Sequence, residues 1–100
     1  MTTQTVVITP STEMSSSASI DYIASLLPTA VINHLATTAG VTRTVSTSSN
    51  GNTHTIVTTW SDDTDKETFK TLMADVSSGV ISTLESEGWA ISFTPLTADL

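Results

Sequence analysis

One stretch near the middle of the chain limits the possible folds most: TVSTSSNGNTHTIVTTW, residues 44–60. Small polar and β-branched residues alternate on both sides of a single Asn-Gly pair, which is typical of a β-hairpin. A type I′ turn at Asn50-Gly51 needs positive φ at both central residues, and it predicts a two-residue connection. Such a turn fixes the pairing of the strands: it places Val41 opposite Trp60, Arg43 opposite Thr58, and Val45 opposite Ile56.

This register divides the hairpin into two faces, because cross-strand partners point to the same side of a sheet. One face carries the large apolar residues, and we expect helices to cover it; it consists of Val41, Val45, Ile56 and Trp60, together with Arg43, Thr47, His54 and Thr58. The other face is rich in hydroxyl groups and consists of Thr42, Thr44, Ser46, Thr55, Val57 and Thr59.

The rest of the chain alternates between strand and helix patterns. Residues 4–10 are β-branched and predict a first strand, and the alternation in residues 89–95 predicts a last one. Apolar residues at helical spacing predict one helix over residues 20–40, where Pro28 either kinks the helix or starts a second one. Residues 62–88 predict a second long helix. Ser17, Ser19 or Asp21 caps the first helix, the acidic run from Asp62 caps the second, and Gly40 and Gly88 end them.

The element order β-α-β-β-α-β predicts the fold class α+β and a ferredoxin-like architecture in one domain, residues 1–100. In this architecture a four-stranded antiparallel sheet carries both helices on one face. The hydroxyl-rich face is then left open, and small β-branched side chains can pack sheet against sheet. We therefore expect a homodimer, with a dimer face formed by Thr42, Thr44, Thr55, Val57, Thr59 and Ser92.

The charge of the chain limits its partners. The net charge is −7, and Arg43, Lys66 and Lys70 are the only cations apart from the histidines. A phosphate backbone is neutralised by clustered basic residues, so we expect neither nucleic-acid binding nor attachment to anionic membranes. No apolar run reaches the roughly 20 residues of a membrane-spanning helix. The lack of cysteine and of a basic N-terminal start favours a cytoplasmic protein, or a virion component if the chain derives from a phage.

The strand, acidic cap and helix start in HTIVTTWSDDTDKETFKTLM, residues 54–73, resemble the dimeric α+β-barrel superfamily. This superfamily includes antibiotic-biosynthesis monooxygenase-like and stress-responsive barrel domains. The resemblance covers most of the chain and implies a homodimer in which two sheets pack together. It also implies a pocket between helices and sheet, although Pro28 and the serine-rich segment before it depart from the pattern around that pocket.

Arg43 is the first candidate for ligand binding, because an arginine on an apolar sheet face needs a carboxylate, solvent or an anionic ligand. The functional interpretation is a carboxylate-binding residue at one end of a pocket that has Trp60, Tyr22 and His34 as walls. The structural alternative is an edge-strand side chain that reaches water beside an acidic helix. His34 fits a helix residue bonded to a carbonyl group, and His54 is expected to be exposed near the hairpin tip.

The sequence contains no pattern that predicts a cofactor, and no metal site is expected. The spacing of Asp63, Asp65 and Glu67 lacks the glycine and the final glutamate of a calcium loop. Three functions therefore stay open. The chain is a homodimeric barrel protein that binds a small apolar or carboxylate-bearing ligand, a structural or assembly protein such as a viral particle component, or a cofactor-independent monooxygenase-like enzyme.

Overall fold

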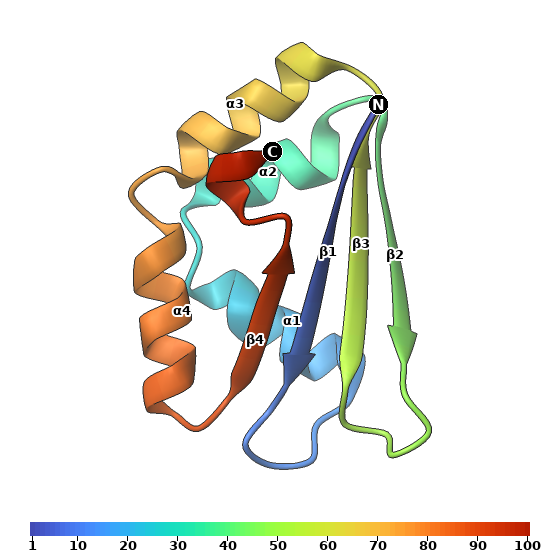
Figure 1. Cartoon of the computed structure of the whole chain (residues 1–100), viewed down its shortest axis with the longest axis vertical. Coiled ribbons are helices and arrows are strands. Elements are labelled where there is room, and N and C mark those ends of the chain that lie inside the picture. The colour runs from blue at the N-terminus through green and yellow to red at the C-terminus, as the bar shows by residue number, and fades with distance from the viewer.

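The chain forms a four-stranded antiparallel sheet in the order β2-β3-β1-β4, in a computed structural model that describes residues 1–100 (Figure 1). The strands are β1 (Thr2–Thr9), β2 (Val41–Thr47), β3 (His54–Trp60) and β4 (Ala90–Thr94). The helices are α1 (Ser16–Ser25), α2 (Thr29–Thr37), α3 (Asp63–Met73), α4 (Ser77–Ser86) and the short 3-10 helix η1 (Thr97–Asp99). The α+β class and the four-stranded antiparallel sheet are confirmed, and the arrangement is compatible with a ferredoxin-like architecture.

The hairpin register is confirmed, but its turn differs from the predicted one. Val41 pairs with Trp60, and the strands stay in that register up to Thr47 and His54. The predicted type I′ turn is wrong, because only Gly51 has positive φ. The loop is longer, and the Asn50 side chain accepts hydrogen bonds from the backbone N–H groups of residues 52 and 53. Lengthening the loop symmetrically on both sides leaves the pairing unchanged.

Both predicted long helices are split. Pro28 is the N-cap of α2 with φ −61° and ψ 148°, so the chain is extended there and the first segment forms two helices. The prediction of one helix over residues 62–88 is wrong, because α3 ends at Met73 and α4 begins at Ser77. Val76 at this break, and Ser77, Ser78 and Gly79 directly after it, all favour helix less than alanine does.

The helix ends also refine the sequence analysis. Ser15, rather than the three predicted residues, caps α1 by accepting a hydrogen bond from the Ala18 N–H. Gly88 ends α4 in a Schellman motif, with the Trp89 N–H bonded to the Leu84 carbonyl over 2.9 Å. Gly40 does not end a helix, because α2 already stops at Thr37.

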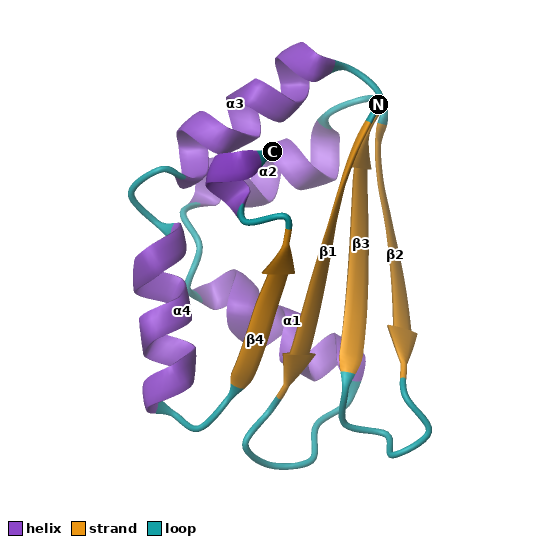
Figure 2. Ribbon diagram, viewed as in Figure 1, coloured by secondary structure: helices purple, strands orange, loops and turns teal.

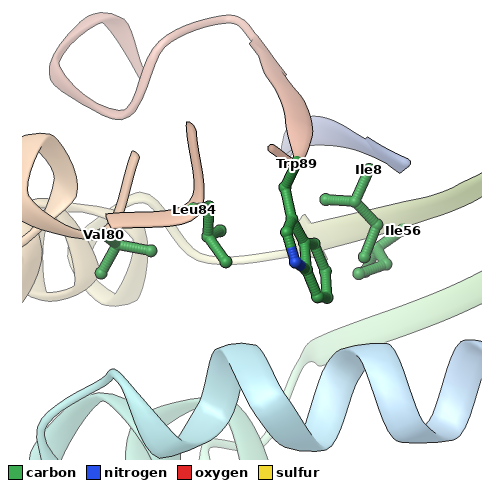
Figure 3. Packing of buried hydrophobic residues seen from close by; sticks show 5 residues of the cluster. All are labelled: Ile8, Ile56, Val80, Leu84 and Trp89. Atoms are coloured by element: carbon green, nitrogen blue, oxygen red, sulfur yellow. The ribbon is translucent and has the colours of Figure 1, made fainter. Parts of the chain in front are cut away.

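The core consists of two apolar clusters on the covered face of the sheet. The first cluster is formed by Ile8, Ile56, Val80, Leu84 and Trp89, and the second by Val31, Trp60, Phe69 and Met73. Figure 3 shows the first cluster, where Trp89 points toward α1 between Leu84 and the pair Ile8 and Ile56. Leu27 and Val76 pack on both clusters, and each lies at the break between two helices. The helix breaks therefore fall where the core divides.

The opposite face of the sheet carries no helix. In Figure 2 this face is turned toward the viewer, and no helix lies in front of β1, β3 or β2. Thr42, Thr44 and Ser92 are exposed on this face, whereas Thr55, Val57 and Thr59 are half-buried on the central strand β3. The remaining members of the open face are Thr3, Thr5, Val7, Thr9, Ser46, Ala90 and Thr94. No residue of this face is charged.

None of the helices in the chain is long and apolar enough to cross a membrane.

Candidate ligand-binding site

A cavity of about 90 Å³ lies between the helices and the covered face of the sheet. This volume is several times the roughly 15 Å³ that one water molecule needs. Of the 14 residues that line the cavity, 11 are hydrophobic, and they include Ile23 and Leu27 before the break at Pro28, and Val31 and Leu35 after it. The cavity therefore lies where the two core clusters separate.

An apolar groove of about 140 Å³ adjoins this cavity between α1, α2 and β2. The residues that line both hollows are Ile23, Leu27, Leu35, Arg43 and Ile56. Arg43 is the only charged residue in either lining, and its side chain is exposed. The guanidinium-bearing residue thus lies where the cavity and the groove meet solvent.

The charge of Arg43 has no partner within the chain. The only ion pairs join Lys66 and Lys70 to Glu67 on α3, and no hydrogen bond in the chain involves the Arg43 side chain. The edge position on β2 agrees with a side chain that reaches water, but no carboxylate of the acidic chain lies against it. Arg43 is therefore available to an anionic group from outside.

Two polar side chains lie deeper in the cavity. Thr58 on β3 pairs with Arg43 on one side and with Gln4 on the other, and all three point to the covered face. Thr58 is 7% exposed and Gln4 is 4% exposed. Sequence reasoning assigned no binding role to either residue. The available signal was the alternation of β1, which places Gln4 on the same face as Val6 and Ile8.

Trp60 and His34 do not line the cavity but form a buried pair next to it. The Trp60 Nε1–H donates a hydrogen bond of 3.2 Å to His34 Nε2, and His34 Nδ1 lies 3.3 Å from the Thr38 hydroxyl. The Trp60 ring packs on Phe69 with 4.8 Å between ring centroids, and His34 stacks on the same ring at 5.9 Å. His34 thus accepts a hydrogen bond from an indole, whereas the sequence predicts a carbonyl partner.

Tyr22 lies apart from Arg43, on the α1 side of the first cluster. Its ring packs on Trp89 at 5.4 Å, and its hydroxyl donates to both Glu87 carboxylate oxygens at 2.5 and 2.7 Å. This hydrogen bond to Glu87 is the main reason that the pKa of Tyr22 is raised above its ordinary value. Of the four candidate residues, only Arg43 lines the cavity.

His54 contradicts the expectation of an exposed side chain, because it is fully buried. Its Nε2 lies 2.9 Å from the Met14 carbonyl and its Nδ1 lies 3.0 Å from the Thr47 hydroxyl. The segment that leads into α1 covers this end of the hairpin, with the Met14 N–H also bonded to Asn52. His54 therefore ties that segment to the sheet.

The acidic run before α3 acts as a helix cap, as predicted. The Asp62 side chain accepts a hydrogen bond of 2.7 Å from the Thr64 N–H, and Asp63 and Asp65 lie in the first helical turn. Negative charge is favourable at this end of a helix. No group of three or more His, Cys, Asp or Glu side chains in the chain is arranged to hold a metal ion.

A larger hollow, about 490 Å³, lies between α3, α4 and the C-terminal segment. Its only charged residue is Lys70, whose Nζ donates to the Leu100 carbonyl over 3.0 Å and lies 3.7 Å from a Glu67 oxygen. This cation is already engaged within the chain, unlike Arg43.

No known family profile matches the chain, and no curated protein or solved structure matches it at a significant level.

Proposed function

We propose that this protein is a homodimeric α+β barrel of ferredoxin-like architecture that binds a small apolar carboxylate between its helices and its sheet. The observation that carries the proposal is the position of Arg43, an unpaired arginine where an apolar cavity meets solvent. The guanidinium group presents a fork of donors that matches a carboxylate.

The composition of the chain adds to this argument. In a protein of net charge −7, most cations have a carboxylate within reach, yet the only arginine has none. The apolar lining beside it favours a hydrocarbon group over water. A ligand with one acidic end and an apolar body therefore fits both features at once.

The lining favours binding over catalysis. Its polar residues are Gln4, Arg43 and Thr58, and none of them is an ordinary general acid or base. His34 is a residue type that often acts as a general acid or base, but it is hydrogen-bonded to Trp60 and lies outside the lining. These observations support a ligand-binding protein over the monooxygenase-like alternative.

The open sheet face supports the dimer. It combines half-buried Val7 and Val57 with threonines whose hydroxyls are already paired: Thr3 with Thr59 over 3.1 Å on this face, and Thr9 with Thr53 of the hairpin loop over 3.0 Å. Burying hydroxyl groups that are already paired in this way costs less free energy than burying unpaired ones. Without charges to desolvate, this face suits a second copy of itself.

Binding is tested by calorimetric titration with hexanoate, a small apolar carboxylate. We expect Arg43→Ala to weaken binding by about 10- to 100-fold, because a hydrogen bond to a charged group contributes roughly 1.5–3 kcal/mol. Lys66→Gln removes the same charge from α3, away from the cavity, and should leave the affinity unchanged. Equal affinities of the wild type and Arg43→Ala would contradict the proposal.

The dimer is tested by light scattering coupled to size exclusion. We expect a dimer for the wild type and a monomer for Val57→Lys, which places a charge in the middle of the open face. Val45→Lys makes the same change on the covered side of the hairpin, where Val45 is 43% exposed, and should stay dimeric. A monomeric wild type would refute the dimer, and large regular assemblies would favour the structural alternative.

A further inference from the structure

The covered face of the sheet carries one polar row, and this row forms the floor of the cavity. Arg43, Thr58 and Gln4 are cross-strand neighbours on β2, β3 and β1. The next cross-strand row holds Val45, Ile56 and Val6. A continuous polar row between two apolar clusters costs free energy unless its groups find partners.

The carboxamide of Gln4 has a fixed orientation. Its Nε2 donates two hydrogen bonds of 3.1 Å, one to the Pro95 carbonyl and one to the Thr97 hydroxyl. The Pro95 carbonyl can only accept, so the amide nitrogen must face it. Both N–H groups are thus used, and the Oε1 atom is left as an acceptor that no group of the chain serves.

The hydroxyl of Thr58 is likewise without a partner in the chain, although the residue is buried. Every fully buried polar side-chain atom in the chain has a hydrogen-bond partner. The free oxygens of Thr58 and Gln4 therefore keep some accessible surface, and both residues line the cavity. An occupant that donates a hydrogen bond there satisfies groups that are otherwise left unpaired.

We propose that the ligand class is a short hydroxy acid, whose carboxylate lies at Arg43 and whose distant hydroxyl donates to Gln4 Oε1 and bonds to Thr58. This assignment rests on the proposed function and extends it. Neighbouring strands lie about 4.8 Å apart, so β2 and β1 are separated by roughly 10 Å. The hydroxyl therefore belongs at the far end of the apolar chain, away from the carboxylate.

The test compares hexanoate with 6-hydroxyhexanoate by calorimetric titration of the wild type and of Thr58→Val. We expect the wild type to bind 6-hydroxyhexanoate about tenfold more tightly, the usual net effect of one hydrogen bond. Thr58→Val replaces the hydroxyl with a methyl group of similar size, so it should reduce this preference. Thr68→Val makes the same change on the exposed side of α3, away from the cavity, and should keep the full preference.

The outcomes separate the two proposals. If hexanoate binds through Arg43 but the hydroxyl brings no gain in the wild type, the hydroxy acid is refuted and the carboxylate-binding function stands. If neither acid binds the wild type, both proposals fail. The wild-type comparison needs no variant, so it decides the question even if Thr58→Val does not fold.

Discussion

The hydrogen bond between Trp60 and His34 gives a sharp test of the core that supports the cavity. Trp60 is 0% exposed and His34 is 8% exposed, so water cannot easily replace either partner. His34→Leu keeps a side chain of similar volume but leaves the indole N–H buried without an acceptor. Such a loss costs about 1–3 kcal/mol. We expect the melting temperature to fall by about 10 °C, since 1 kcal/mol corresponds to roughly 4–8 °C in a domain of this size.

A double-mutant cycle isolates the pair from the effects of changed volume. Trp60→Phe removes the donor, and the double variant removes donor and acceptor together. We expect the double variant to lose about 1–2 kcal/mol less unfolding free energy than the two single losses added together, because it leaves no buried polar group without a partner. Urea unfolding followed by circular dichroism measures this, and it does not depend on tryptophan fluorescence. Strictly additive losses would refute the inferred bond.

Two further predictions concern other parts of the fold. The Tyr22 hydroxyl, the only phenol in the chain, should titrate above its ordinary pKa in an ultraviolet absorbance titration, and Glu87→Gln should lower that pKa. Because the pKa of Tyr22 is raised in the folded state, the stability that its hydrogen bond to Glu87 contributes is full below the unfolded-state pKa and is lost as pH rises through the folded-state pKa. An unchanged Tyr22 titration in Glu87→Gln would contradict this assignment. Gly40→Ala and Gly51→Ala each place alanine at positive φ, at a cost of about 1–2 kcal/mol. Gly40→Ala should be the more destabilising in urea unfolding by a small margin, because the Ser61 hydroxyl must rotate away from the new Cβ, whereas nothing lies within 4 Å at Gly51. A smaller loss for Gly40→Ala than for Gly51→Ala would count against this.

The sequence predicts the hairpin register better than it predicts the turn. Alternation places Trp60 and Ile56 on one face whatever the loop length, so a symmetric change in the loop leaves the pairing intact. The apolar spacing of residues 62–88, in contrast, predicts one continuous helix where the structure has two. Met73 and Val80 keep helical spacing, yet they belong to different clusters and to different helices.

The candidate site was predictable only in part. Arg43 is found from local information, because it is a charged residue on an apolar strand face. Trp60 and His34 look like pocket walls in the sequence, but they bond to each other, and this depends on how α2 packs on β3. The partnerless oxygen of Gln4 depends on a contact with residues more than 90 positions away, which no local pattern contains.

The most direct test of the central claim is an NMR measurement of contacts between hexanoate and the protein. We predict nuclear Overhauser effects from the ligand methylene groups to the methyl groups of Leu27, Leu35 and Ile56, with shifts of the Arg43 guanidinium signal. Effects confined to the hollow beside Lys70, or none at saturating ligand, would contradict a carboxylate site between the helices and the sheet.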